Sequence, residues 1–334
     1  MTVKKLVEEY MTKHAKKNKS SWPEDERILN KDVIPVWGDR KAKDITRRDV
    51  LTLIEGMRER GNGITTNTFK IIRRMFRFAV KQEIIESTPC YAFEKGEELP
   101  IPVAKERSLS ESEVKIFMAG IDKCAISENV RNILKMILFT GQRPEEVCTM
   151  HRSEIDGAWW EFTPKETVIT KQIPRKQRIY LTKTALQIIG DAKDYIFSSP
   201  VPKMDKDDNP IPTPITVRAV SYALRRNLTT HVVKSKKPTR PATKSIKKKP
   251  FVVDVEKKLT IDKFTPHDLR RTCATLISEL GYPDEVVDAI LAHLKKGEIR
   301  TYNKNKYDKE KKAAMESWEI KLQEIIARQD DVGT

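Results

Sequence analysis

Residues 264–302 read FTPHDLRRTCATLISELGYPDEVVDAILAHLKKGEIRTY, and the rest of the chain is interpreted outward from this stretch. The pair Thr265-Pro266 is a helix-start signal, because threonine caps helices well and proline is tolerated in the first turn. We therefore expect a helix from about Pro266 to Leu280 that is stopped by Gly281. The apolar residues expected to anchor this helix in a core are Leu269, Ala274, Leu276, Ile277 and Leu280.

Two polar side chains lie on one face of this helix near its start. His267 and Arg270 are three positions apart, a spacing that places them side by side on a helix. Helix N-termini present unpaired N–H groups and a partial positive charge, which suit an anionic oxygen. A second helix is expected over about Asp284–His293, and Tyr302 follows nine residues after His293. A lone His-x-x-Arg pair, or an aromatic residue after a helix, is more often structural, so the rest of the chain has to supply the remainder of a phosphate site.

The composition favours a basic protein that binds a polyanion. At 334 residues the chain is long enough for two domains, and its 64 Lys and Arg against 48 Asp and Glu give a net charge of +16. Such an excess predicts attraction to nucleic acid first, and to a membrane surface less readily. The first residues have no apolar signal core, and no apolar run approaches the ~20 residues of a membrane span. The scattered cysteines, without a Cys-x-x-Cys pair, predict free thiols and no structural zinc; they are Cys90, Cys124, Cys148 and Cys273.

Apolar residues at helical spacing predict four helices in about the first 85 residues. Pro23 begins the second helix, and Thr46 with Asp49 forms a capping box for the third. A break at residues 61–63 precedes the fourth, over roughly Thr66–Gln82. A solvated helix face explains any one basic cluster equally well, but the charge excess of the whole chain favours DNA contact for the set. The outward basic residues are Lys13, Lys16, Lys17, Lys19, Arg47, Arg48, Arg73, Arg74 and Arg77.

A second candidate anion site lies in residues 138–147, which read LFTGQRPEEV. Pro144 suits the first position of a helix, so Arg143 is expected just at a helix N-terminus. Glu146, three residues further on, is placed to orient that guanidinium. The alternative is that Arg143 simply pairs with a carboxylate.

Two short strands are predicted at 159–162 and 178–181, with a lysine-containing turn region between them. Lys165, Lys171 and Lys176 all lie in this region. A lysine on a hairpin can swing into a site from the side, as a proton donor requires, and the residues alone leave all three open.

The chain is divided by a polar, proline-containing segment at residues 94–107, EKGEELPIPVAKER. We expect a helical DNA-binding domain at 1–93, an interdomain linker at 94–107, and a catalytic domain at 108–334. That second domain carries a basic insertion at 234–249, with eight basic residues and no acidic one, and a C-terminal helix from Asp308 to about Arg328. The insertion is read as a flexible loop or arm, either solvated or in contact with the DNA backbone. The apolar stripe of the C-terminal helix must be buried in its own domain or against a partner, and consists of Met315, Trp318, Leu322, Ile325 and Ile326.

The ordered set of motifs resembles the tyrosine recombinase (phage integrase) family. The pieces TGQRPEEV, TPHDLRRT and LAH…Y are similar to its Arg-x-x-Glu, His-x-x-Arg and His-to-Tyr elements, in the same order and with the usual nine-residue last step. The ending YNKNKYDKEKKAAMESW looks like the P4-type subgroup carried by phages and genomic islands. The resemblance covers about residues 2–320. It implies a mainly α fold with a small β component: an N-terminal four-helix, SAM-like core-binding domain and a C-terminal α+β catalytic domain.

The resemblance also implies an activity, site-specific recombination of DNA for integration or excision of a mobile element. Arg143 and Arg270 would each bind phosphoryl oxygens in bidentate fashion and stabilise the charge that grows in the transition state. Glu146 would support the site from behind. Positive side chains then do the work of a metal, the covalent intermediate conserves the bond energy, and we expect no cofactor, no metal and no ATP.

The resemblance implies the remaining roles too, and the chemistry of phosphodiester attack by a phenol agrees with the residue types. Tyr302 would form a 3′-phosphotyrosine and release a 5′-hydroxyl, with His267 helping to remove its proton, since tyrosine titrates near ~10. Lys171 is favoured as the donor to the departing 5′-oxygen, with the other two hairpin lysines still open. His293 would donate to a phosphate oxygen.

The implied partners are double-stranded attachment sites. We expect a homotetramer on paired DNA sites that exchanges strands through a Holliday junction, a monomer free in solution, accessory DNA-bending or directionality proteins, a cytoplasmic, nucleoid-associated location and no membrane. One rival is a type IB topoisomerase-like enzyme, which would act as a relaxing monomer. Another is a catalytically inactive DNA-binding protein, which would not become trapped covalently on DNA.

The sequence departs from the family pattern at identifiable places. Tyr307 is a second tyrosine close to Tyr302, and the hairpin reads Ile179-Tyr180-Leu181 where the subgroup usually has Val-Pro-Leu. The basic insertion lengthens the stretch before the His-x-x-Arg motif. The subgroup's usual arm-site-binding domain has no counterpart, so we expect either that the chain was trimmed or that the enzyme lacks arm binding.

Overall fold

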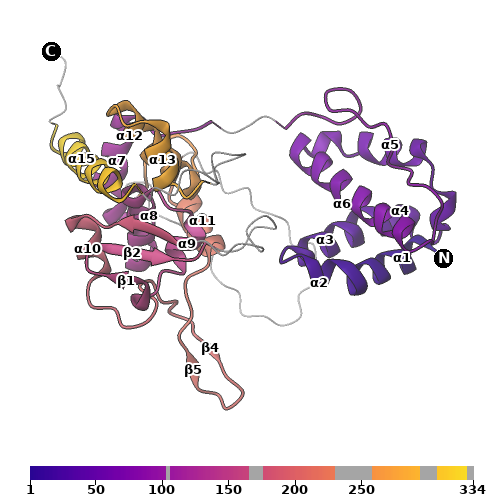
Figure 1. Cartoon of the computed structure of the whole chain (residues 1–334), viewed down its shortest axis with the longest axis horizontal. Coiled ribbons are helices and arrows are strands. Elements are labelled where there is room, and N and C mark those ends of the chain that lie inside the picture. Colours follow the sequence, from indigo (N-terminus) through magenta and orange to yellow (C-terminus); the bar gives the residue numbers. More distant parts are fainter. Residues whose placement is uncertain (103–105, 165–175, 230–257, 294–306, 329–334) are drawn as a thin grey trace. The chain divides into compact units, whose positions relative to one another are not determined.

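The computed structural model describes residues 1–102, 106–164, 176–229, 258–293 and 307–328 (Figure 1). The chain forms two compact units, Met1–Glu106 and Arg107–Thr334, which we call the N-terminal unit and the C-terminal unit. The predicted fold class, mainly α with a small β component, is confirmed. Among the described residues, no helix has the length and apolar content needed to cross a membrane.

The N-terminal unit consists of four helical stretches, as predicted. The first two each contain a π-helical turn in the middle, where one extra residue enters the helix. The stretches are α1 (Val3–Tyr10) with the turn Met11–Ala15 and α2 (Lys16–Asn18); α3 (Trp22–Ile28) with the turn Leu29–Val33 and α4 (Ile34–Trp37); α5 (Arg47–Glu55); and α6 (Asn62–Lys81). Short 3-10 turns lie at Ala42–Asp44 and Arg58–Arg60.

Helix α6 is the centre of this unit's core. The predicted start near Thr66 is wrong, because Gly61 takes the chain into the helix with a φ of 112° and the helix begins at Asn62. Gly63 therefore lies in the first turn of α6, at a position where a Cβ would contact nothing within 4 Å. The capping box predicted for α5 is confirmed: the Thr46 N–H donates to Asp49 at 2.8 Å, and the Asp49 N–H donates to the Thr46 hydroxyl at 3.2 Å. The buried residues that α6 contributes include Phe69, Ile72, Met75, Phe76 and Ala79.

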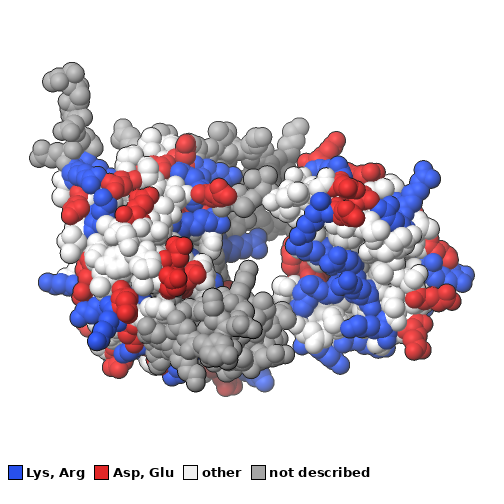
Figure 2. Space-filling view, turned by 45° about the horizontal axis from the view of Figure 1, so that its top comes forward, with Lys and Arg blue, Asp and Glu red and all other residues white. Residues whose placement is uncertain are grey.

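The outer face of α6 is basic. Its positively charged residues recur at helical spacing and so share one face, opposite the buried residues. We call this set the α6 stripe: Lys70, Arg73, Arg74, Arg77 and Lys81. All are exposed except Arg73, which is partly buried with its guanidinium 5.7 Å from the Phe69 ring centre. Figure 2 shows Lys and Arg side chains in a band across one face of this unit.

The C-terminal unit combines helices with a small antiparallel sheet (Figure 1). Its helices are α7 (Glu111–Gly120), α8 (Glu128–Thr140), α9 (Pro144–Cys148), α10 (Lys183–Ile189), α11 (Val217–Arg226), α12 (Pro266–Glu279), α13 (Asp284–Ile290) and α15 (Asp308–Ala327). Its 3-10 turns are Ile121–Lys123 and Arg152–Glu154. The strands β1 (Ile155–Asp156), β2 (Trp159–Phe162) and β3 (Gln177–Tyr180) pair in that order, with Trp159 opposite Tyr180. The strands β4 (Lys203–Met204) and β5 (Pro210–Ile211) form a separate hairpin that the sequence had not predicted.

The core of this unit is built around α8, on which α12 packs. Ile133 and Ile137 of α8 are fully buried. Trp318 of α15 is also buried, and its indole N–H donates to the Leu138 carbonyl at 3.0 Å. The C-terminal helix therefore buries its stripe in its own unit, the first of the two predicted alternatives, although Ile326 is 43% exposed and does not belong to the stripe. The four cysteines are buried and form no disulfide, as predicted.

Helix α12 runs over Pro266–Glu279, within one residue of the predicted helix, although its C-cap Leu280 is 37% exposed and does not anchor the core. The predicted end of the next helix is wrong. Helix α13 ends at Ile290 and does not reach His293. The reason lies at Ala292, whose φ of 54° is left-handed and breaks the helix before the histidine.

Candidate active site

Helix α12 positions Arg270 from a well-capped start. Thr265 and Asp268 form a capping box, in which the Thr265 N–H and hydroxyl each donate to the Asp268 carboxylate at 2.8 Å. Pro266 occupies the first helical position, where its missing N–H costs nothing. The helix therefore begins at a defined residue, and the positions of His267 and Arg270 on its first turn are set by that start.

Arg270 is held in place by backbone carbonyls. Its side chain is only 3% exposed and donates to the Gly141 carbonyl at 2.9 Å and to the Leu291 carbonyl at 2.6 Å. These two acceptors lie at the ends of α8 and α13, so the guanidinium links three helices. A guanidinium has five N–H donors in a planar fork, so these two bonds fix its plane while leaving donors for an anion.

The turn between α8 and α9 supplies both Arg143 and one of those carbonyls. Gly141 ends α8 with a φ of 65°, and a Cβ at this position would lie 3.1 Å from the Cys273 sulfur. Arg143, partly buried, is the extended residue that precedes Pro144 at the start of α9. The sequence prediction of Arg143 at a helix N-terminus therefore agrees with the backbone, although α9 is only five residues long.

The charges of Arg143 and Glu146 both act on Arg270. Burial first, and then the positive charge of Arg143, lowers the pKa of Arg270 to about 9, while Glu146 acts in the opposite direction. Glu146 is 6% exposed, so its carboxylate is inside the protein. Two guanidinium groups close enough to repel each other carry an electrostatic cost. An anion bound between them would offset it.

His267 belongs to the same neighbourhood. Partial desolvation lowers its pKa, and the charges of Arg271 and Arg270 lower it further. Arg143 acts in the same direction, whereas Asp268 opposes the shift. The imidazole is therefore neutral at neutral pH and able to accept a proton.

His293 is oriented by a carboxylate. Its Nδ1 lies 2.7 Å from an oxygen of Asp288, and its backbone N–H donates to the Asp288 carbonyl at 3.0 Å. A carboxylate partner places a proton on Nδ1, which leaves Nε2 as the atom presented to a ligand. The side chain is exposed, in keeping with a ligand-facing role.

The two remaining predicted residues, Lys171 and Tyr302, lie outside the described residues, as does Lys165. Lys176 is described, and its ammonium pairs with Glu161 on β2 at 2.8 Å while the side chain stays 75% exposed. Tyr307 is also described: it precedes α15 with a φ of 54° and packs, partly buried, against the core of the unit. Arg143, Glu146, His267, Arg270 and His293 thus come from three segments, namely α9 with its N-cap, α12 and the residues after α13. The hairpin lysine and the tyrosine stay predictions.

Sequence reasoning missed two glutamines that support this site. Gln142 is fully buried, and its amide N–H donates to the Ile290 carbonyl at 2.7 Å. Gln177 on β3 is also buried and donates to the Ala289 carbonyl at 2.7 Å. Both bind carbonyls at the end of α13, next to the Leu291 carbonyl that receives Arg270. Gln142 could have been noticed from its place between Gly141 and Arg143, but nothing in the sequence pointed to Gln177.

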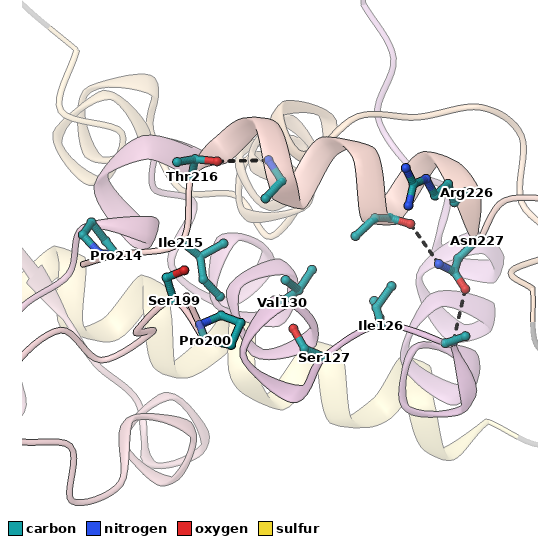
Figure 3. Close-up of a pocket in the computed structure, with 13 residues that line it drawn as sticks. Ile126, Ser127, Val130, Ser199, Pro200, Pro214, Ile215, Thr216, Arg226 and Asn227 are labelled. Carbon is teal, nitrogen blue, oxygen red and sulfur yellow. Dashed lines mark hydrogen bonds between the residues drawn. The ribbon is translucent and has the colours of Figure 1, made fainter. Parts of the chain in front are cut away.

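A pocket of about 390 Å³ lies elsewhere, between the start of α8, the segment before α11 and α11 itself (Figure 3). Its lining includes Ile126, Val130 and Ile215 and none of the predicted site residues. Of its polar side chains, Asn227 is used within the fold: it donates to the Ala223 carbonyl at 2.9 Å and accepts from the Ala125 N–H at 3.1 Å. We therefore assign the pocket no part in the site. Within the described residues, no group of three His, Cys, Asp or Glu side chains could hold a metal ion.

Comparison with known families matches both units. Residues 107–309 match the phage integrase family, and residues 3–95 match the phage integrase central domain. The chain is similar to two prophage integrases of Escherichia coli (strain K12). It is 23% identical to IntA over 304 residues, 87% of this chain and 62% of IntA, and 25% identical to IntZ over 313 residues, 90% of this chain and 65% of IntZ. The chain thus spans less than two thirds of the length of these relatives.

Solved structures share the fold. A lambda integrase (75–356) dimer bound to a COC′ core site has a TM-score of 0.62 at 17% identity, covering 90% of this chain and 100% of that one. A lambda integrase tetramer bound to a Holliday junction has a TM-score of 0.60 at 17% identity, covering 89% and 79%. The Tn1549 transposon integrase (aa 82–397) in complex with circular intermediate DNA has a TM-score of 0.58 at 16% identity, covering 95% and 99%.

Proposed function

The chain belongs to the phage integrase family, and from that premise we propose that it is a tyrosine site-specific recombinase. It would cut and rejoin double-stranded DNA through a 3′-phosphotyrosine intermediate, during integration or excision of a mobile element. The observation that carries the proposal is the convergence of two distant segments: the buried Arg270 donates to the Gly141 carbonyl, two residues before Arg143, and the charge of Arg143 lowers the pKa of both Arg270 and His267. Such a cluster of positive charge suits the binding of a phosphate group.

In the proposed reaction, the two arginines bind the non-bridging oxygens of the scissile phosphate. Arg270 can do so without reorganising, because its plane is held by the Gly141 and Leu291 carbonyls. Preorganised donors aimed at developing charge are commonly the largest single contribution to catalysis. Glu146 offsets part of the repulsion between the two guanidinium groups. His293, with its Nδ1 on Asp288, would donate from Nε2 to a phosphate oxygen as the imidazolium, because Nε2 of the neutral ring with its proton on Nδ1 can only accept.

The remaining steps move two protons. The phenol oxygen of Tyr302 forms a bond to phosphorus while the bond from phosphorus to the 5′-oxygen breaks. His267 accepts the phenol proton, for which a neutral imidazole is required. Lys171 gives a proton to the departing 5′-oxygen, and rejoining reverses both transfers. No cofactor, metal or ATP enters this scheme.

The two halves of the chain would divide binding and chemistry. We assign core-site DNA binding to residues 1–93, a linker to 94–107 and catalysis to 108–334. The α6 stripe supplies exposed positive charge suited to the phosphate backbone. By analogy with the DNA-bound integrases of the same fold, the active form would be a homotetramer on paired sites, formed from monomers in the cytoplasm and aided by accessory DNA-bending or directionality proteins. The P4-type subgroup stays a prediction.

The test is covalent trapping on DNA. A duplex carrying a candidate core site, with a nick beside the cleavage position, loses its short 5′-hydroxyl fragment after attack and so cannot be rejoined. Wild type, Tyr302→Phe and Tyr307→Phe would be incubated with it, and a protein–DNA adduct that survives denaturation would be quantified. We expect an adduct from wild type and from Tyr307→Phe but none from Tyr302→Phe.

Each other outcome has a defined meaning. Loss of the adduct only in Tyr307→Phe would keep the reaction and move the nucleophile. No adduct from wild type, on DNA that it demonstrably binds, would leave a DNA-binding protein without cleavage activity. Formation of adducts by a protein that stays monomeric on paired sites would favour a topoisomerase-like relaxing enzyme.

A further inference from the structure

Helix α13 ends in a turn that leads directly to His293. The His293 N–H donates to the Asp288 carbonyl at 3.0 Å, which is the long hydrogen bond of a Schellman motif. Between these two residues, Ala292 adopts a left-handed φ of 54° at the motif position where glycine is usual. A residue with a Cβ raises the energy of this conformation, so the turn is strained and persists only where its surroundings determine it.

Side chains from three other segments bind the carbonyls just before this turn. The donors and their acceptors are Gln177 to Ala289 at 2.7 Å, Gln142 to Ile290 at 2.7 Å and Arg270 to Leu291 at 2.6 Å. These donors come from β3, from the turn between α8 and α9, and from α12. The last carbonyls of a helix have no partner inside the helix, and here residues distant in the sequence supply the donors. Since Arg270 is a predicted phosphate ligand, the end of α13 connects His293 to Arg270.

The two glutamines are buried, and their amide N–H groups are used on this helix end. Gln177 also lies 3.4 Å from the Ile290 carbonyl, and Gln142 also donates to the Thr140 carbonyl at 2.9 Å. The amide oxygen of Gln142 is buried with no hydrogen-bond partner among the residues that the structure describes. An unpaired buried oxygen costs stability, and a methionine at this position would avoid that cost. The N–H bond to the end of α13 gives a reason for the glutamine.

We infer that Gln142 and Gln177 are positioning residues, which stabilise the left-handed turn at Ala292 and thereby set where His293 presents its imidazole relative to Arg270. This inference rests on the proposed function and deepens it, because His293 and Arg270 would bind the same phosphate. Both glutamines are buried, so they act through the turn and not by contact with DNA. Fixing the turn in advance lowers the entropy lost when the two ligands reach one phosphate.

Gln177→Met is the sharper of the two possible changes. Methionine has a similar length and packs well in a core, but it has no N–H to donate. Gln142 is the neighbour of Arg143, so a change at 142 acts on two predicted phosphate ligands at once. Gln142→Met therefore serves as a second variant for the structure of the turn and not for the rate.

The first measurement uses the protein without DNA and follows hydrogen exchange of the His293 N–H by NMR. This N–H is protected by its bond to the Asp288 carbonyl and becomes exposed when the turn opens. In Gln177→Met and in Gln142→Met we expect exchange to be about fivefold to tenfold faster, the effect of one lost hydrogen bond. Adding Ala292→Gly to either variant should restore the protection, since glycine adopts the left-handed conformation without strain.

The second measurement is a double-mutant cycle on a nicked core-site duplex. The rate of adduct formation at saturating DNA would be compared in wild type, Gln177→Met, His293→Ala and the double variant. We expect Gln177→Met to slow wild type by about tenfold, because His293 is then poorly placed. In the His293→Ala background the same change should have no further effect, since a residue that acts through His293 has nothing left to position.

Asn227→Leu is a matched control for the loss of a buried amide. Asn227 is buried at the end of α11, and neither of its partners, Ala223 and Ala125, belongs to α13. This variant should lower the midpoint of urea denaturation, as Gln177→Met does. It should leave both the exchange of the His293 N–H and the rate of adduct formation at their wild-type values.

The outcomes separate the inference from the function on which it rests. The positioning role is overturned by equal slowing from Gln177→Met in the wild-type and His293→Ala backgrounds. It is also overturned by unchanged exchange of the His293 N–H, or by an equal slowing in Asn227→Leu, while wild-type adducts keep the recombinase. Absence of adducts from wild type, on DNA that it binds, would overturn the proposed function. The exchange data would then show separately whether the glutamines stabilise the turn.

Discussion

The two units hold positive charge in opposite ways. On α6 of the N-terminal unit, the basic side chains of the α6 stripe extend into solvent from a helix whose other face is buried. In the C-terminal unit, Arg270 is 3% exposed and its guanidinium is tied to two backbone carbonyls. Burial lowers the pKa of Arg270 to about 9, so it stays charged at neutral pH at an energetic cost that the fold has to offset.

This difference assigns two tasks to the two sets of charges, affinity for DNA and precise placement of the phosphate. Exposed lysines and arginines can follow a phosphate backbone and release counterions, but their flexible side chains define no single position. A buried guanidinium is costly to desolvate, yet it offers its remaining donors in a fixed plane. The α6 stripe should therefore govern how tightly DNA is bound, and Arg270 how fast it is cut.

The largest expected effect is that of Arg270→Lys. An ammonium cannot reach both the Gly141 and Leu291 carbonyls and still form a bidentate contact with phosphate. Adduct formation at saturating DNA should fall by about 10²–10³-fold, as when a preorganised transition-state donor is lost. DNA affinity should change little.

The matched control is Arg152→Lys, since Arg152 is an exposed arginine of the same unit. It should cleave normally. A modest effect of Arg270→Lys, similar to that of the control, would contradict the view that a fixed guanidinium sets the rate.

A smaller effect is expected from the glycine that supports Arg270. Gly141→Ala forces a side chain into the left-handed region and places its Cβ 3.1 Å from the Cys273 sulfur and 3.4 Å from a Leu291 methyl. We expect the free energy of unfolding to fall by about 1–3 kcal/mol, from backbone strain and crowding together. Urea denaturation would measure it, with adduct formation at saturating DNA measured alongside.

Gly157→Ala separates the two causes. Gly157 has a similar φ of 55°, but a Cβ there would meet nothing within 4 Å. This variant should lose only the backbone part, about 1 kcal/mol, and should cleave normally. Equal losses in the two variants would mean that the contact with Cys273 and Leu291 is unimportant.

Local patterns in the sequence predicted much of the fold. Helical periodicity identified the four stretches of the N-terminal unit, and the Thr46–Asp49 capping box is present because its two residues are three positions apart. Local signals also placed Arg143 and the His267–Arg270 pair at helix starts. Each of these depends on residues within one or two turns of one another.

The contacts that define the site could not be predicted in this way. The acceptors of Arg270 lie 129 and 21 positions away, and the Arg178–Asp308 pair spans 130 positions. No spacing rule reports such contacts, because they arise from how the helices pack. The helix expected to run to His293 ends earlier, because Ala292 is left-handed. Alanine rarely adopts this conformation, so the residue type gave no sign of it. Lys171 and Tyr302 stay predictions.

In the N-terminal unit, single changes in the α6 stripe should have modest effects on binding alone. Arg77→Gln should reduce the slope of log affinity against log salt concentration by about 0.9, the value for one phosphate contact on B-DNA. Adduct formation at saturating DNA should stay at the wild-type rate. Salt titrations of binding to a core-site duplex would measure the slope.

Arg27→Gln is the control for this charge change. Arg27 is exposed too, but it pairs with Glu24 on the same helix at 2.6 Å, so its charge is already compensated. Its slope should equal that of wild type. A slower cleavage step in Arg77→Gln at saturating DNA would contradict the view that the α6 stripe affects only the affinity for DNA.

The smallest expected effect concerns the protonation of His267, whose pKa is lowered first by desolvation and then by Arg271. A histidine with a lowered folded pKa binds protons less well folded than unfolded, so acidification below its unfolded value near 6.5 destabilises the fold. The neutral base is lost at lower pH still, as the pH falls through the folded pKa of His267. Cleavage should therefore decline on the acid side. Arg271→Gln removes a positive neighbour and also frees Asp268, with which Arg271 pairs at 2.5 Å. Both changes raise the pKa of His267, so the acid limb of the pH–rate profile should move to higher pH.

At pH 7.5 the rate should change by less than about twofold, because the base is mostly neutral there in either protein. Single-turnover adduct formation measured from pH 5 to pH 8 would locate the limb, and NMR titration of the histidine ring would assign it. Arg152→Gln, which removes an arginine with no part in the pKa of His267, should leave the limb in place. A limb that stays unmoved in Arg271→Gln while the NMR pKa rises would mean that another group accepts the phenol proton. Arg270 would then keep its role on the phosphate, and His267 would be left as a hydrogen-bond donor beside it.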